Sequence, residues 1–215
     1  MPVKKTTVRP FVIKIPEEML MADLDLFRQE ALKLGAAAAE IIQANQIVVD
    51  ERVRLKCTVP RCLRAGESPN CPPYVPDLDV IRKAFDKYSW GILLKTHLEP
   101  IEAYASKSGQ EQSLLFHQKS AEIVYEIERL AYKHGYYLAM GLGGGSCKDY
   151  LCRGLVCQFL DSGRCRFPLR ARPAMEAMGI DVFDLISKVG WKSYPLMDEL
   201  DQIPCAISVG LVLIY

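Results

Sequence analysis

Cysteine is the residue type in this chain whose grouping points most directly to chemistry. Seven of the eight cysteines fall in two polar segments that contain prolines. The first segment carries three, separated by four and eight residues: Cys57, Cys62 and Cys71. The second carries four, separated by four, four and seven residues: Cys147, Cys152, Cys157 and Cys165. Because thiolates bind metal ions and iron–sulfur clusters, we predict that these seven residues are metal ligands.

The second segment has the features expected of an iron–sulfur site. Four thiolates from one segment are the usual complement of one [4Fe–4S] cluster. The glycines Gly143, Gly144 and Gly145 would let backbone N–H groups approach the cluster sulfides. Arg166 and Arg172 would offset the negative charge of a cluster held by four thiolates. We therefore predict a [4Fe–4S] cluster here, contacted by these three glycines and two arginines.

The first segment offers only three cysteines, so its site is less determined. Three thiolates can hold a second cluster with one iron left open, and an open metal position can take a substrate atom. His97, His117 or an acidic side chain could instead supply a fourth ligand. The eighth cysteine, Cys205, lies in an apolar run, and we predict a core residue there because free cysteine is among the most buried residue types.

Zinc is the main alternative cofactor. The spacings of Cys57 with Cys62 and of Cys147 with Cys152 fall within the range of paired zinc ligands. Two hypotheses follow. The first is an iron–sulfur protein that carries electrons or does chemistry at an open iron, and whether it is an enzyme stays open. The second is a zinc-stabilised structural or partner-binding module.

The composition is that of an ordinary soluble globular protein, with 215 residues, 50% of them hydrophobic, and a formal net charge of +1. This charge gives no reason to expect nucleic acid. No apolar run approaches the roughly 20 residues that span a bilayer, and the N-terminus is too polar for a signal peptide. We expect a cytoplasmic protein whose thiols stay reduced, which disfavours a disulfide framework.

Basic residues are concentrated where the cysteines are. From residue 147 to residue 172 there are six basic residues against two acidic ones. Nearby cations lower the pKa of a thiol and favour the thiolate, which is the form that binds metal. The same arginines could hold an anion, so the expected partners are a redox protein or a small anionic or sulfur-containing substrate.

Local patterns predict an α/β fold: a single domain of residues 1–215, with a lead-in at 1–48 and the main body at 49–215. We expect a mixed β-sheet flanked by helices, with the two cysteine-rich loops at one end. The expected strands are 7–15, 41–42, 47–49, 90–98, 136–142 and 205–215, and the expected helices are 20–34, 78–88, 108–134, 173–179 and 182–189. Residues 51–77, with five prolines, are expected to form an ordered loop.

The order of these elements predicts where the second cysteine segment lies. A strand at 90–98, a helix at 108–134 and a strand at 136–142 suggest a parallel crossover. The cysteine segment would then begin at the carboxyl end of a strand, where open α/β sheets commonly place ligands. The final strand is nearly all apolar, which predicts a central position in the sheet, and it could also pair across a homodimer.

Several strings of the sequence resemble a known family. DERVRLKCTVPRC, NCPPYVPDLD, GLGGGSC and CRFPLRARPAMEAMGIDVF are similar to the predicted metal-binding proteins catalogued as a domain of unknown function. The resemblance covers roughly residues 49–215. It implies that the seven grouped cysteines are the family's metal-binding positions. Such proteins occur mainly in anaerobic bacteria and archaea, so the resemblance favours iron–sulfur over zinc.

Overall fold

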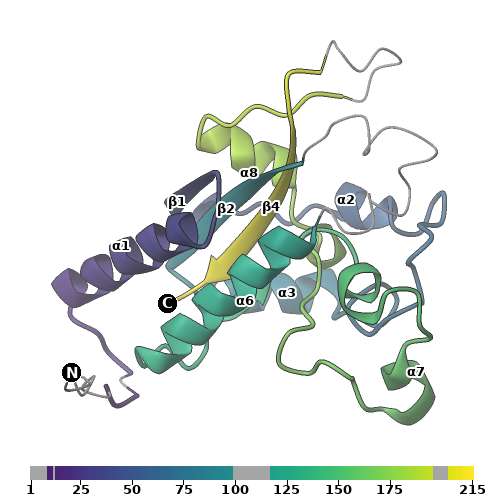
Figure 1. Cartoon of the computed structure of the whole chain (residues 1–215), viewed down its shortest axis with the longest axis horizontal. Coiled ribbons are helices and arrows are strands. Elements are labelled where there is room, and N and C mark those ends of the chain that lie inside the picture. The colour runs from purple at the N-terminus through teal and green to yellow at the C-terminus, as the bar shows by residue number, and fades with distance from the viewer. Residues whose placement is uncertain (1–8, 12, 99–116, 196–202) are drawn as a thin grey trace.

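A computed structural model describes residues 9–11, 13–98, 117–195 and 203–215 of the chain (Figure 1). Its helices are α1 (Glu17–Lys33), α2 (Glu51–Leu55), α3 (Leu78–Phe85), α6 (Gln118–Lys133), α7 (Gln158–Ser162) and α8 (Val182–Lys188). Its strands are β1 (Ala38–Gln43), β2 (Trp90–Leu98), β3 (Met140–Leu142) and β4 (Ala206–Leu213). No helix within the described ranges is both long enough and apolar enough to cross a membrane.

The strands form one sheet in the order β1-β2-β4-β3. Every neighbouring pair is antiparallel, and the register of the central pair runs from Gly91 opposite Leu213 to Leu98 opposite Ala206. The C-terminal strand therefore has a neighbour on both sides. Its central position, which its apolar sequence predicts, is confirmed.

Helices cover both faces of the sheet because successive side chains of a strand point to opposite faces. On β2, Ile92 and Leu94 pack into one apolar cluster with α1 and α6. The residue between them, Leu93, packs into a second cluster with α3 and α8 on the other face. Residues 17–43, which the sequence places in a lead-in segment, thus supply a helix and a strand to the same sheet and core.

Two glycines on adjacent strands let α6 lie close to the sheet. A Cβ atom on Gly141 would come within 2.6 Å of Val124 Cγ1, and one on Gly210 within 2.4 Å of Val124 Cγ2. Both separations are shorter than carbon atoms tolerate, so larger residues would push the helix away. The close approach matters for the site, because α6 contacts the second cysteine segment.

The α/β class and most of the predicted elements are confirmed. The helix that begins after Asp181 is capped as expected, because the Asp181 side chain accepts a hydrogen bond from the Asp184 backbone N–H. The predicted helix at 108–134 is described as α6 from Gln118, and its predicted start lies outside the described residues. The predicted helix at 173–179 is only a 3-10 turn at Glu176–Met178.

Four predictions about the sheet are corrected, and the first is the strand at 47–49, which is only an isolated bridge between Val49 and Ile180. The sheet is antiparallel in all its described pairs rather than mixed, because β4 lies between β2 and β3 and runs opposite to both. The strand predicted at 136–142 is confined to Met140–Leu142. The strand predicted at 7–15 is not formed by its described residues, whose sequence contains Pro10, which lacks a backbone donor.

Candidate metal centre

The first cysteine segment begins in a short helix that the sequence pattern did not predict. The Asp50 side chain accepts a hydrogen bond from the Arg52 backbone N–H at 2.7 Å and so caps α2. Cys57 follows this helix by two residues. Its thiol pKa is raised mainly by burial and further by the nearby thiols of Cys62 and Cys71, so the three cysteines of this segment are close in space.

In the second segment, local helical turns set the positions of the cysteines. Cys147 precedes a π-helical turn at Lys148–Cys152, in which hydrogen bonds join residues five apart. The four-residue gap between Cys147 and Cys152 therefore places them at the two ends of one turn. Cys157 stands at the N-cap of α7, and Cys165 follows the end of that helix.

The four cysteines of the second segment line one small cavity. Its walls also include Ser68, Asn70 and Phe167: the full lining is Ser68, Pro69, Asn70, Cys147, Lys148, Leu151, Cys152, Cys157, Cys165, Phe167 and Ala171. The thiols of Cys147, Cys152 and Cys157 are buried, and that of Cys165 is partly buried. All eight cysteines of the chain are free thiols, so none is joined in a disulfide.

Polar groups around this cavity are directed at sulfur atoms. Asn70 Nδ2 donates to Cys147 Sγ at 3.4 Å, and the Phe167 backbone N–H donates to Cys165 Sγ at 3.3 Å. The hydroxyl of Ser68 is fully buried and has no hydrogen-bond partner of normal geometry, yet it lies close enough to Cys147 to lower that thiol's pKa. Donors aimed at sulfur suit a thiolate better than a thiol, because a thiolate is the stronger acceptor.

Burial nevertheless dominates the charge state of the free Cys147 thiol. Its pKa is raised to about 11, mainly by desolvation, with Asn70 and Ser68 opposing the shift. The prediction that nearby cations lower the thiol pKa is therefore wrong for this residue. Among the described residues, no three His, Cys, Asp or Glu side chains are placed to hold one ion as they stand, so bound metal would draw the thiols inward.

The two cysteine segments pack against each other, on the side of the molecule away from α1 (Figure 1). Arg64 Nη2 pairs with Asp149 Oδ1 at 2.6 Å, and Lys148 Nζ pairs with Glu67 Oε2 at 2.5 Å. Near the second pair, Cys71 Sγ lies 3.6 Å from the Ser146 hydroxyl. Cys71 also contributes to the raised pKa of Cys147, so the two groups of thiols are neighbours.

A protein family described as "predicted metal-binding protein (DUF2284)" matches residues 40–214. The match covers both cysteine segments and most of the sheet. The chain belongs to this family. The resemblance seen in the sequence is confirmed, and with it the coarser prediction of a cysteine-rich, metal-binding class of protein. Comparisons with curated proteins and with solved structures give no match.

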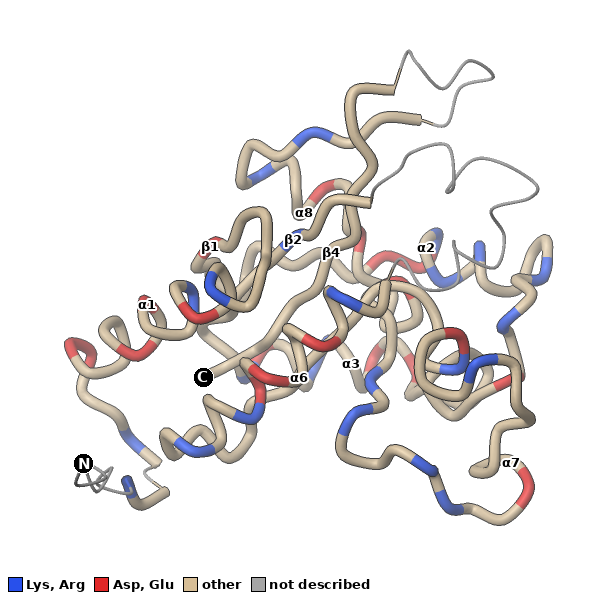
Figure 2. Tube along the Cα trace, viewed as in Figure 1, with Lys and Arg blue, Asp and Glu red and all other residues tan. Residues whose placement is uncertain are grey.

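Several cations of this DUF2284 chain lie along the second segment (Figure 2), and two of them are paired with oxygen atoms rather than with thiols. Arg172 Nε lies 2.6 Å from Glu128 Oε2 on α6, and Arg166 Nη1 donates to the Val156 carbonyl at 2.6 Å. Arg172 therefore has a carboxylate partner and Arg166 a carbonyl partner, rather than a thiol. A cofactor contact by either arginine stays a prediction.

The glycine run also has a packing role. A Cβ on Gly144 would lie 2.8 Å from His117 Nδ1, and one on Gly145 would lie 2.4 Å from His117 Cδ2. These two glycines therefore make room for the imidazole ring, while Gly143 forms an isolated β-bridge with Ala174. Contact of the three glycines with a cofactor stays a prediction.

Sequence reasoning missed the residues that surround the sulfurs. Ser68 and Asn70 were not singled out, although Asn70 directly precedes Cys71 in one of the family-like strings. Among the proposed fourth ligands, His97 is exposed on β2, and His117 Nδ1 is hydrogen-bonded to Ser208 Oγ at 2.7 Å. An acidic residue far along the chain, Glu176, also contributes to the raised pKa of Cys57.

Proposed function

We propose that this chain is an iron–sulfur protein, with one [4Fe–4S] cluster held by Cys147, Cys152, Cys157 and Cys165. One observation carries the proposal: all four thiols line a single cavity whose other walls contribute polar donors. The donor set fits the group, because four thiolates are the complement of one such cluster. The buried Ser68 hydroxyl, which lacks a partner, supports the same assignment, since a cluster sulfide would be an acceptor for it.

A cluster bound here would supply one-electron redox chemistry, and the surrounding residues would tune it. Asn70 and the Phe167 backbone N–H already donate to ligand sulfurs. Hydrogen bonds to the sulfurs stabilise the more negative, reduced state and so raise the reduction potential. Burial of the thiols excludes water from the site, which protects a cluster from hydrolysis and oxidation.

We further propose that Cys57, Cys62 and Cys71 form a second site for iron. Cys71 lies beside the proposed [4Fe–4S] site of the second segment, because its sulfur contacts Ser146. Cys62, in contrast, is exposed. This gradient of burial suits electron transfer from a buried cluster to the surface, or access of a small anionic or sulfur-containing substrate to an open iron. Both uses need reduced thiols, in keeping with a cytoplasmic, reducing compartment. A redox partner and a homodimer remain predictions.

Anaerobic purification with counts of iron and acid-labile sulfide tests the proposal. We expect a brown protein with about four irons, or about eight if both sites hold clusters. Cys157→Ser should remove about four irons and the visible absorption of the cluster that they form. Cys205→Ser is the matched control, because Cys205 lies outside the cysteine cavity, and it should keep the full iron content.

The same measurement of metal content distinguishes a zinc-binding protein from an iron–sulfur protein. The pairs Cys57 with Cys62 and Cys147 with Cys152 have the spacing of zinc ligands, and the latter pair spans a single turn. A colourless protein with stoichiometric zinc, whose content falls in Cys157→Ser, would contradict the iron–sulfur proposal. It would indicate a zinc-stabilised module instead. Unchanged iron in Cys71→Ser would exclude iron at the first segment.

A further inference from the structure

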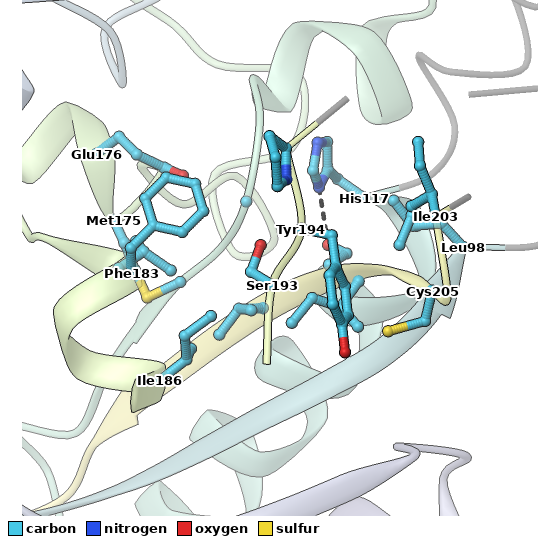
Figure 3. A pocket seen from close by; sticks show the side chains of 17 residues that line it. Leu98, His117, Met175, Glu176, Phe183, Ile186, Ser193, Tyr194, Ile203 and Cys205 are labelled. Atoms are coloured by element: carbon cyan, nitrogen blue, oxygen red, sulfur yellow. Dashed lines mark hydrogen bonds between the residues drawn. The ribbon is translucent and has the colours of Figure 1, made fainter. Parts of the chain in front are cut away.

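A second cavity lies apart from the cysteine cavity, between α8 and the beginning of β4 (Figure 3). Its volume is about 390 Å³, which is within the range of small-molecule sites. Met175, Phe183 and Ile186 are drawn along one side of it, and Leu98 and Ile203 along the other. These side chains give the cavity apolar walls, which suit the hydrocarbon part of a small organic molecule.

The cavity has one charged side chain among its described lining residues, and that is Glu176. Glu176 takes part in none of the ion pairs between described residues. Glu176 is an exposed residue, so its carboxylate is accessible to a ligand in the cavity. An accessible carboxylate can accept a charge-assisted hydrogen bond from the ammonium group of a ligand.

His117, which also lines the cavity, does not supply that cation. Ser120 has one hydroxyl proton and donates it to the His117 carbonyl at 3.0 Å, so its Oγ accepts from Ser208 at 2.7 Å. Ser208 Oγ must then accept from His117 Nδ1–H, also at 2.7 Å, which leaves Nε2 with its lone pair. Burial lowers the His117 pKa, so the ring is neutral at pH 7.

From this combination of apolar walls, a carboxylate without a cation partner among the described residues and a neutral imidazole, we propose that the cavity binds a small primary amine. The ammonium group pairs with Glu176, and the hydrocarbon part packs against Phe183 and Ile186. The inference goes beyond the proposed function and does not depend on the metal. The charge of Glu176 reaches Cys57, so an amine bound there lies beside the first cysteine segment.

Isothermal titration calorimetry with 2-phenylethylamine tests this proposal on the full, metal-loaded chain at pH 7. We expect the amine to bind at least about tenfold more tightly than 2-phenylethanol, which has a similar shape but no charge, because a charged hydrogen bond is stronger than a neutral one. The anion 3-phenylpropionate should bind more weakly than the alcohol. No detectable binding of the amine at millimolar concentration would overturn the proposal.

Variants locate the ammonium. Glu176→Gln keeps the shape of the side chain and should reduce amine affinity to that of the alcohol. Phe183 is exposed, so Phe183→Ala should not disturb folding. This variant should lower the affinities for the amine and for the alcohol by a few-fold. Glu126→Gln, which removes a carboxylate on α6 outside the cavity lining, is the matched control and should change nothing.

Metal content measured on the same samples shows whether Glu176 binds the amine or instead supports metal binding by the cysteines. Full metal content in Glu176→Gln, together with lost amine binding, supports the proposal. Loss of metal in Glu176→Gln would overturn the proposal of an amine site, because Glu176 would then be needed for metal binding by the cysteines. Unchanged amine affinity in Glu176→Gln would also overturn it. Neither result would bear on whether the four cysteines of the second segment hold a cluster.

Discussion

The chemistry of the cysteine cavity is set by the immediate surroundings of each sulfur. Around Cys147 the protein removes water, which favours the neutral thiol, and also directs Asn70 and Ser68 at the sulfur, which favours the thiolate. Burial is the larger effect, so the metal-free thiol keeps its proton at pH 7. Metal binding must displace that proton, and the donors then stabilise the charged sulfur that results.

A dependence of stability on pH follows for the metal-free protein. The pKa of Cys147 is raised from 9.0 to about 11, so the folded state keeps a proton that the unfolded state loses in this range. This thiol should therefore leave the stability unaffected below pH 9 and should lower it by roughly 3 kcal/mol between pH 9 and pH 11. Urea denaturation across this range measures the loss.

The Cys147→Ala variant isolates this contribution. Its unfolding free energy should fall less steeply with pH than that of the wild type, whereas Cys205→Ala should follow the wild type. Equal slopes for the wild type and Cys147→Ala would show that the thiol is not desolvated in the folded state. Metal-loaded protein should not show the effect, because its sulfur carries no proton.

At the scale of elements, the site depends on how two loops are held against each other and against α6. Arg64 and Asp149 join the loops through an ion pair whose side chains are 27% and 14% exposed. Arg172 joins the second loop to Glu128 on α6. Because the glycines of β3 and β4 let α6 lie close to the sheet, these pairs connect the cysteine segments to the rigid part of the fold.

A double-mutant cycle measures the contact between the loops. Arg64→Ala leaves the partly buried Asp149 without its cation, and Asp149→Ala removes the opposite partner, so each should destabilise the protein. The double variant should lose less unfolding free energy than the sum of the losses of the two single variants, with a coupling energy of about 0.5–3 kcal/mol. Urea denaturation gives the stabilities, and chelator-driven metal release should quicken in both single variants.

An exposed ion pair provides the control for this cycle. Glu126 and Arg129 pair on the solvent face of α6 and lie on no cysteine loop. Their coupling energy should be below about 1 kcal/mol, and metal release should be unchanged. A coupling between Arg64 and Asp149 as small as this would mean that the ion pair does not hold the loops together.

On the scale of the whole molecule, the apolar core and the cysteine loops are largely separate. Both large apolar clusters are built from the sheet and from helices that pack on its two faces. Cys147 belongs instead to a small cluster with Ala121 and Tyr150. The fold of the sheet should therefore persist when the loops lose their ligand.

Hydrogen–deuterium exchange of metal-loaded and metal-free protein tests this separation. Removal of metal by a chelator should increase exchange across residues 57–71 and 147–165, because the loops lose the ligand that joins their thiols. Backbone amides of β2 and β4 should stay protected in both states. Loss of protection in the strands together with the loops would show that metal binding and folding of the sheet are one cooperative event.

The sequence by itself determined the elements whose signals are local. Hydrophobic periodicity, the cap at Asp181 and the apolar C-terminal run were sufficient for α1, α8 and β4, because each signal acts within a few residues of chain. The two groups of cysteines, and the family to which they belong, were equally readable, since spacing along the chain is itself local.

Only the tertiary structure decided the features that depend on distant residues. The insertion of β4 between β2 and β3 made the sheet antiparallel, and no pattern within those strands encodes a neighbour more than sixty residues away. The same reason applies to the raised pKa of Cys147. The desolvation of Cys147 and the pairing of Arg172 with Glu128 both arise from packing between distant segments. Charge counted along the chain could not reveal which partner each cation would meet.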